Sequence, residues 1–387
     1  MKMTNQLRKT VAGLICITAA SMPQLFAQAV KQEKPNFKIQ HKVDVTGIKN
    51  QARTGTCWSF ATSSFLESEA IRMGKGQHDI SEMYFVRHNY PRKADHYVRM
   101  QGKANFGQGS LSHDVITAAA LHGIVPEEIY NGLNYGKDFH DHGQLFSLLK
   151  GMLDGVLESK GKALDPKWKE AYEAVLDTYL GKIPESFEYQ GKTYSPQSYA
   201  KEVIGFDAGN YIELTSFANY PLYQPCVLEV PDNWANGIFY NVTVDELEEV
   251  MDNALKNGFS IAWDGDVSEK AFSHGKGMAI VPEKEVKGED GKIDLVASIP
   301  EKVIDQEMRQ ETFDNFTTTD DHLMHVVGSM VDDNGVKFYL TKNSWGDSNE
   351  LGGYLYMSKS YVRLKTVGIL VHKDAIPKRI KDKLNIK

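Results

Sequence analysis

Residues 57–73 carry apolar side chains around a wide arc of a helix. Starting from Trp58, apolar residues recur at i, i+3 and i+7, and further ones widen the arc until Gly74 ends the pattern. A surface helix needs only one apolar stripe, so a helix this apolar is expected to be central and buried. The rest of the chain therefore has to fold around it.

Other helices are predicted before and after the middle of the chain. The segment "SLSHDVITAAALHG" predicts a helix over 112–122 that ends at a glycine, and the polar segment 141–205 is also predicted to be helical. In "TVDELEEVMDNALKNG", Thr243 is the expected N-cap, and Glu246 three residues later completes a capping box. Helices therefore account for much of the first two thirds.

The last third has the pattern of strands. "FSIAWDGD" is expected to form a buried strand, and "HVVGSMV" and "VKFYLTKNSWG" flank "DDNG", a strong hairpin signal. Residues 283–318 are charged and irregular, which predicts a long surface excursion. Helices first and strands later indicate an α+β fold with two subdomains.

Composition restricts the class of protein only broadly. The 387 residues are 41% hydrophobic and 25% charged, as in ordinary soluble globular proteins, and the formal charge is −7. A net negative charge argues against a dedicated nucleic-acid binder, so we expect no nucleic-acid partner. "HDHG" at 140–143 alternates histidines, but a third ligand at recognisable spacing is missing, so we expect neither a metal nor a cofactor.

The first 29 residues have the pattern of a cleaved signal peptide. A positively charged start precedes the apolar run "VAGLICITAA", and "AQA" provides small residues for cleavage. Bulky residues directly before Cys16 disfavour the alternative of a lipoprotein. No other stretch approaches transmembrane length. We therefore expect an exported protein, either periplasmic or secreted, without a transmembrane segment.

Two cysteines, Cys57 and Cys226, remain after the predicted cleavage. Exported proteins often pair cysteines, so one possibility is a Cys57–Cys226 disulfide. The other is catalysis, because Cys57 stands at the predicted start of the 57–73 helix. Unpaired amides and the helix dipole stabilise a thiolate there. A nucleophilic cysteine also needs a base, normally a histidine.

The predicted hairpin indicates which histidine could serve. A two-residue turn pairs His325 with Ser344, and a four-residue loop pairs it with Lys342. Either register brings His325 within one residue of Asn343, whose amide oxygen could orient the imidazole. His322 is a nearby alternative, but the "HVVG" context and the strand start favour His325. Gln51, six residues before Cys57, could donate to an oxyanion together with the Cys57 amide.

The segments around Cys57, His325 and Asn343 resemble motifs of a known protein family. "QARTGTCWSFAT", "MHVVG" and "KNSWG", in that order, resemble the three active-site blocks of papain-like cysteine peptidases, with Trp345 where that family has a tryptophan beside its histidine. Between the blocks, "GIVPEEIY" and "YNVTVDELEEVMDNALKNGFSIAWDGDV" are most similar to the bleomycin hydrolase and bacterial aminopeptidase C group. The resemblance favours catalysis by Cys57 over the disulfide. It implies a papain-like fold, with a helical subdomain carrying Cys57 and a β-barrel-like subdomain carrying His325 and Asn343.

The resemblance also implies a division of the chain. A peptidase domain would span 30–387, after the signal peptide. Its parts would be a Cys-helix part at 30–140, a helical insertion at 141–235, a β-rich part with His325 and Asn343 at 236–372, and a basic C-terminal tail at 373–387.

The implied function is that of a cysteine aminopeptidase acting on peptides through an acyl-enzyme. In the bleomycin hydrolase group the chain's own terminal carboxylate lies in the cleft and holds the substrate's amine, and the protein forms hexameric rings. A homo-oligomer is therefore implied here. The present tail is shorter, so the reach of Lys387 is open. The alternatives are a cysteine endopeptidase with an open cleft and a non-catalytic binding protein on a papain-like fold.

Overall fold

A computed structural model gives the structure of the protein over residues 36–159, 163–285, 287–288, 291, 293–295 and 299–387. The predicted signal peptide, residues 1–29, lies outside the described residues, so it and the expected export stay predictions. Within the described part, no helix combines the length and the apolar character that crossing a membrane requires. Everything described below belongs to one compact unit, Lys34–Lys387.

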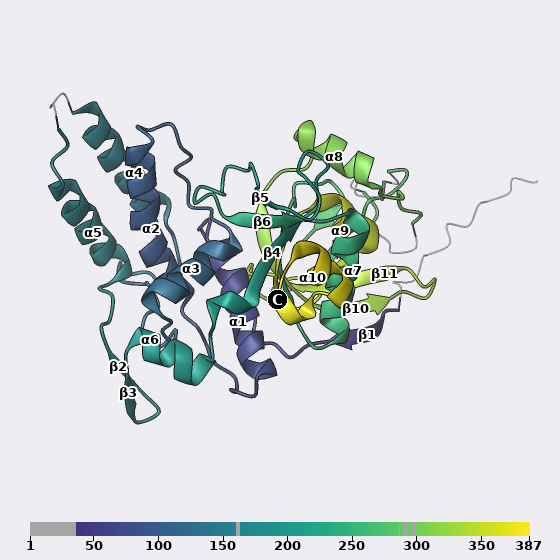
Figure 1. Ribbon diagram of the computed structural model, residues 1–387, viewed down its shortest axis with the longest axis horizontal. Helices are drawn as coiled ribbons and strands as arrows, with labels where there is room; N and C mark the ends of the chain where they lie inside the picture. The colour runs from purple at the N-terminus through teal and green to yellow at the C-terminus, as the bar shows by residue number, and fades with distance from the viewer. Residues whose placement is uncertain (1–35, 160–162, 286, 289–290, 292, 296–298) are drawn as a thin grey trace, which may run out of the picture. The chain divides into compact units, whose positions relative to one another are not determined.

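A layer of helices forms the first part of the chain. In Figure 1, α2, α4 and α5 lie side by side, with α1 and α3 between them and the sheet. The bounds are α1 Cys57–Arg72, α2 Glu82–Arg99, α3 Ser112–His122, α4 Gly143–Glu158 and α5 Lys167–Leu180. Every residue of α1 from Cys57 to Ala70 is buried, which confirms the expected central helix.

Eleven of the described strands form one mixed sheet. Their order is β5-β6-β4-β13-β7-β10-β11-β12-β9-β8, and β1 pairs with β10. Neighbours are antiparallel except β4 with β6 and β9 with β12. The bounds are β1 Lys38–Lys42, β4 Tyr211–Thr215, β5 Pro225–Val227, β6 Ile238–Asn241, β7 Ile261–Gly265, β8 Phe272–Ser273, β9 Met278–Ala279, β10 His322–Val331, β11 Lys337–Lys342, β12 Tyr354–Ser358 and β13 Thr366–His372. Helices and this sheet together confirm the predicted α+β class.

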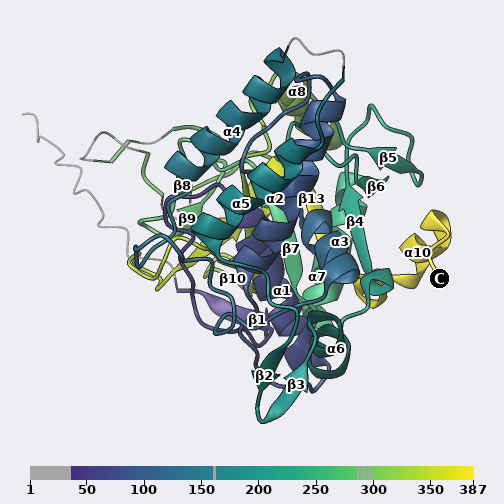
Figure 2. The same ribbon diagram turned by 90° about the vertical axis from the view of Figure 1, so that its left-hand side faces the viewer.

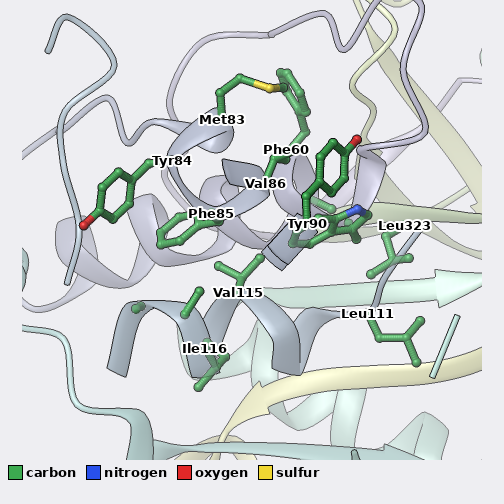
Figure 3. Packing of buried hydrophobic residues seen from close by; sticks show 14 of the residues in the cluster. Phe60, Met83, Tyr84, Phe85, Val86, Tyr90, Leu111, Val115, Ile116 and Leu323 are labelled. Atoms are coloured by element: carbon green, nitrogen blue, oxygen red, sulfur yellow. The ribbon is translucent and has the colours of Figure 1, made fainter. Parts of the chain in front are cut away.

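Side chains alternate between the two faces of this sheet. On β7, Ala262 joins the apolar cluster that contains α1, whereas Ile261 and Trp263 join the cluster on the opposite face. Figure 3 shows part of the first cluster, where side chains of α2 and α3 meet, with Leu323 of β10 close by. The second cluster packs against α7 Val244–Lys256, α9 Lys359–Lys365 and α10 Lys378–Leu384. The sheet thus separates α1 from these three helices.

Several predicted elements are confirmed. The helix over 112–122 is α3, and α7 begins after Thr243 with the predicted capping box to Glu246. "FSIAWDGD" contains β7, and the "DDNG" loop joins β10 to β11. The structure pairs His325 with Lys342, as the four-residue loop predicted, and not with Ser344. The loop itself differs, because Val331 pairs with Lys337, and an irregularity between Val326 and Gly328 shifts the register before His325.

Other expectations are corrected. The segment 141–205 is not helical throughout: after α5 come the hairpin β2 Phe187–Tyr189 and β3 Lys192–Tyr194, the short helix α6 Pro196–Tyr199 and a π-helical turn. The predicted helical insertion 141–235 also contains β4 and β5 of the main sheet. These strands are short and partly exposed, so their apolar pattern is weak.

Several helices were not predicted, including α9 and α10, and two others have a clear reason. One is α2, which contains Pro91 and buries the polar Arg87 and Lys93, so its apolar periodicity is interrupted. The other is α8 Gln306–Asp314, inside the segment expected to be an irregular surface excursion. Only Arg309 of α8 is buried, so this helix lacks the apolar stripe that sequence patterns detect.

The tail of the chain is packed rather than free. Ile380 and Leu384 of α10 are buried in the cluster that contains α7. Arg379 forms ion pairs with Glu246 and Glu249, and Lys383 Nζ lies 2.7 Å from Glu246 Oε1. The basic residues of the tail thus complement acidic residues on α7.

Arg309 offers a test of the fold. Its fully buried guanidinium donates to the carbonyl oxygens of Ser216 at 2.6 Å and Arg363 at 2.9 Å, and to that of Thr366. We expect Arg309→Met to lower the free energy of unfolding by about 3 kcal/mol or more, because each buried carbonyl that loses its donor costs about 1–3 kcal/mol. Urea unfolding measures this. The control Arg379→Met removes an exposed ion pair and should cost less than about 1 kcal/mol. Equal losses of unfolding free energy in the two variants would contradict the conclusion that the hydrogen bonds of Arg309 stabilise the fold.

Candidate active site

Cys57 is the first residue of α1 and is almost completely buried, with 8% of its surface exposed. The loop before it is held by Gln108, whose side-chain oxygen accepts from the Gly55 N–H at 2.8 Å and whose carbonyl accepts from the Trp58 indole at 3.0 Å. A Cβ on Gly55 would lie 3.0 Å from Gln108 Cβ, so this close approach favours glycine. The thiol is therefore fixed at the positive end of a buried helix.

The start of β10 lies directly against this thiol. The backbone N–H of Leu323 faces the Cys57 sulfur and acts to lower the pKa of its thiol. His322, the residue before Leu323, opens β10 and pairs with Gly265 of β7. The contact therefore places the histidine at the start of β10, rather than one further along it, next to the cysteine.

His322 pairs with Asn343. The Nε2 of His322 lies 2.8 Å from Asn343 Oδ1. The Asn343 amide is oriented by two further contacts, from the Ser344 N–H to its oxygen at 2.7 Å and from its nitrogen to His274 Nδ1 at 3.1 Å. Because the amide oxygen can only accept, Nε2 of His322 carries the proton. In the neutral ring, Nδ1 is then the nitrogen that can take a proton.

Trp345 packs over this histidine, as the resemblance implied. Its ring centroid lies 4.6 Å from that of His322, with the planes tilted by 34°. His274 also contacts the tryptophan, at 5.1 Å. Both His322 and Asn343 are less than 4% exposed. The tryptophan thus shields the His322–Asn343 contact from water.

His325 does not pair with Asn343, so the predicted hydrogen bond between them is wrong. Its Nδ1 lies 2.9 Å from Ser64 Oγ of α1, and Lys342 Nζ donates to the same hydroxyl at 2.8 Å. The reason is strand alternation: His322 and His325 are three residues apart on β10 and face opposite sides of the sheet. Lys342 points toward α1 with His325, so Asn343, the next residue, points the other way.

Gln51 belongs to the same site. Its Oε1 accepts from Ser344 Oγ at 2.6 Å, and one N–H of its side chain donates to the Thr54 carbonyl at 2.7 Å. Its backbone N–H donates to the Ser344 carbonyl at 2.8 Å. Gln51 therefore connects the loop before Cys57 to the residue after Asn343. Of the predicted site residues, the structure brings Cys57, Gln51 and Asn343 together, with His322 in place of His325.

Burial keeps both reactive groups neutral. It raises the pKa of the Cys57 thiol to about 12, against the Leu323 N–H, and nearby carboxylates including Asp232 and Asp320 raise it further. Burial lowers the pKa of His322 to about 4, although the hydrogen bond to Asn343 acts in the other direction. At neutral pH the resting pair is therefore a thiol beside an uncharged imidazole.

The alternative use of Cys57 in a disulfide is wrong. Cys57 and Cys226 are both free thiols, and Cys226 is buried in β5. Cys226 packs with the same apolar cluster as α1, as expected for a small hydrophobic side chain.

The C-terminus lies elsewhere. Ile380 and Leu384 anchor α10 to α7, on the face of the sheet opposite α1. Figure 2 shows α10 and the chain end at the edge of the molecule, away from α1. The terminal carboxylate of Lys387 is therefore not brought to Cys57 by its own chain.

Comparisons with known proteins agree with this geometry. Over 91% of this chain and 86% of the relative, the sequence is 22% identical to Aminopeptidase W of Lactobacillus delbrueckii subsp. lactis. It is also 22% identical to Aminopeptidase C of the same organism, over 98% of this chain and 91% of that protein. Among solved structures, PepW from Lactobacillus rhamnosis HN001 superposes with a TM-score of 0.69 at 18% identity, covering 90% of this chain and 84% of that chain.

A family model completes the comparison. The model described as the Peptidase C1-like family matches residues 175–387, which is more than half of the chain and includes His322 and Asn343. The similarity to PepW shows that the fold is shared, and it confirms the papain-like architecture implied by the sequence motifs. The chain therefore belongs to the Peptidase C1-like family and is a cysteine peptidase with a papain-like fold.

Proposed function

We propose that this protein is a cysteine aminopeptidase that removes N-terminal residues from peptides through a Cys57–His322–Asn343 mechanism. The observation that carries the proposal is the 2.8 Å contact between His322 Nε2 and Asn343 Oδ1 beside the buried Cys57. The names of the full-length relatives, Aminopeptidase W and Aminopeptidase C, support removal of N-terminal residues.

In the proposed mechanism, Nδ1 of His322 takes the proton of the Cys57 thiol as its sulfur attacks the scissile carbonyl. Asn343 holds the ring in the tautomer that leaves Nδ1 free and stabilises the imidazolium that forms. The backbone N–H of Cys57 and the second N–H of the Gln51 side chain would stabilise the oxyanion. His322 then protonates the departing amine, leaving a thioester. Water, activated by His322, hydrolyses this acyl-enzyme and restores the thiol.

This proposal replaces the earlier expectation that His325 is the base. The Nδ1 of His325 is occupied by Ser64, and burial together with Lys342 lowers the pKa of its ring well below the ordinary value. His325 is also on the α1 face of β10, whereas Asn343 faces the other way. We assign His325 to positioning α1 against the sheet.

A cysteine endopeptidase is the second candidate, because one observation favours it. The tail of the chain is packed against α7, so its carboxylate does not block the cleft next to Cys57. A papain-like cleft without such a block could accept a peptide that continues beyond the N-terminal side of the scissile bond. The choice between the two activities depends on what holds the substrate's amine.

Two fluorogenic substrates separate these candidates. We expect leucyl aminomethylcoumarin amide to be hydrolysed and its N-acetylated form to be inert, with activity reduced at least about 10³-fold in Cys57→Ala because the nucleophile is lost. Initial rates of the two proteins with the two substrates give the answer. Cysteine-dependent hydrolysis of the acetylated substrate would contradict the aminopeptidase and favour the endopeptidase. Cys226→Ala is the matched control and should retain full activity.

The identity of the base can be tested in the same assay. We expect His322→Ala to lower kcat by about 10²- to 10⁴-fold, the range typical of a lost general base. His325→Asn should keep kcat within a few-fold but lower the thermal unfolding temperature, because His325 is buried beneath α1. Comparing kcat and unfolding temperature for both variants separates the roles. A larger loss of kcat in His325→Asn would contradict this assignment.

A further inference from the structure

Three carboxylates approach the thiol from different parts of the chain. Asp264 is the residue before the last of β7 and lies opposite Leu323 of β10. Asp320 comes two residues before His322, and Asp232 lies in the loop between β5 and β6. All three raise the pKa of the Cys57 thiol, in agreement with these positions near the site.

Of the three carboxylates, Asp264 has the fewest hydrogen-bond partners among the described residues. Its side chain is 95% buried, since 5% is exposed, yet neither carboxylate oxygen has a hydrogen-bond donor among the described residues. The same is true of Oδ2 of Asp320. The two carboxyl groups contact each other, and burial raises the pKa of both, that of Asp320 to about 7. Ionising both carboxyl groups at once is therefore unfavourable without a cation beside them.

Two nearby basic side chains already contact other acidic residues. His113 Nδ1 lies 2.7 Å from Glu213, and the guanidinium of Arg92 is 3.9 Å from Asp114. This leaves Lys93, which is buried and whose ammonium donates to the Gly109 carbonyl. The charge of Lys93 acts on Asp232 and Asp320, but among the described residues no ion pair joins it to any of the three carboxylates. One ammonium cannot balance three ionised carboxylates.

Asp232 lies against Gly109, the residue after Gln108, which contacts the loop before Cys57. A Cβ on Gly109 would come within 1.7 Å of Asp232 Oδ2, so the carboxylate rests directly on the backbone of this residue. Asn105 Nδ2 donates to Asp232 Oδ1 at 3.1 Å, which orients it. Asp232 and Asp320 each keep part of their residue surface exposed, unlike Asp264.

The chemistry of the substrate matches this position. In an N-terminal residue, the α-amine is two bonds from the carbonyl carbon that the sulfur attacks. A group that binds the protonated amine must therefore lie within a few ångströms of Cys57. A buried cation requires negative partners, and charge-assisted hydrogen bonds to carboxylates are the strong kind.

We propose that Asp232, Asp264 and Asp320 bind the α-ammonium group of the substrate's N-terminal residue. This rests on the proposed function, and it assigns the amine-binding role to side chains within the cleft. The ammonium donates to the unpartnered oxygens of Asp264 and Asp320 and balances the excess charge. Peptides with a free, protonated amine are then the preferred class, although the terminal carboxylate of Lys387 is absent from the site.

A substrate pair that differs only in the amine tests the proposal. One substrate is leucyl aminomethylcoumarin amide, and the other is its 4-methylpentanoyl analogue, in which hydrogen replaces the amine. The discrimination ratio is kcat/KM for the first divided by kcat/KM for the second. We expect Asp232→Asn/Asp320→Asn to lower this ratio by about 10- to 100-fold, as expected for lost hydrogen bonds between charged groups. Any effect of these substitutions on the Cys57 thiol acts on both substrates and cancels in the ratio.

Two further variants accompany this measurement, one as a control and one as a second test of the site. Asp382→Asn makes the same charge change on α10 and should leave the ratio at the wild-type value. Asp264→Asn, in which a single oxygen becomes a nitrogen, should lower the ratio as well. Because buried variants can fail to fold, alkylation of Cys57 by iodoacetamide in the wild-type protein provides a second measurement. L-leucinamide should slow this reaction, and 4-methylpentanamide should not.

The outcomes are distinguishable. An unchanged ratio in Asp232→Asn/Asp320→Asn and in Asp264→Asn, with free-amine activity retained, overturns the carboxylate proposal and leaves the aminopeptidase intact. Equal protection of Cys57 by the two amides also overturns the proposal. Equal hydrolysis of the two substrates by the wild-type enzyme overturns the aminopeptidase itself, and the proposed amine site with it.

Discussion

The contact between the start of β10 and the first turn of α1 governs the geometry of this protein. The N–H of Leu323 reaches the Cys57 sulfur, so the position of the strand and that of the helix are set together. β10 is held by hydrogen bonds to β1, β7 and β11, and all but its last residue are buried. His322 and, across the ladder, Asn343 are therefore carried to the thiol by the sheet as a whole.

Buried polar groups hold α1 in that position. Glu67, in the middle of the helix, is fully buried and lies 3.3 Å from Lys49 Nζ, which also reaches Glu82 of α2 at 2.6 Å. On the sheet side, Ser64 binds both Lys342 and His325. Polar networks of this kind are costly unless every member finds a partner, so they tolerate few alternative positions of the helix.

The charges on the two faces of the sheet have different consequences. On the α7 face, Arg379 and Lys383 of the tail meet acidic residues, and the tail is used for packing. On the α1 face, carboxylates gather beside Cys57 with one buried ammonium, Lys93, among them. An excess of negative charge next to a cysteine disfavours its thiolate, so this arrangement would be a disadvantage without a cationic ligand.

Much of the fold followed from local pattern in the sequence. The width of the apolar arc predicted that α1 is buried, the capping box at Thr243 predicted the start of α7, and the turn in "DDNG" predicted the β10–β11 hairpin. Elements without a local apolar pattern were missed: α2 buries Arg87 and Lys93, and α8 buries only Arg309. Their polar side chains are satisfied by partners far away in the sequence, which periodicity does not report.

The residues of the site were likewise predicted only in part. The sequence by itself indicated the proposed nucleophile, the asparagine and Gln51, because each lies in a short, specific motif around Cys57 or Asn343. Only the tertiary structure decided between two histidines three residues apart. Strand alternation places them on opposite faces, and the register that pairs His325 with Lys342 turns Asn343 toward His322. Register and face depend on the whole sheet and on α1, so no local pattern could settle which imidazole meets the thiol.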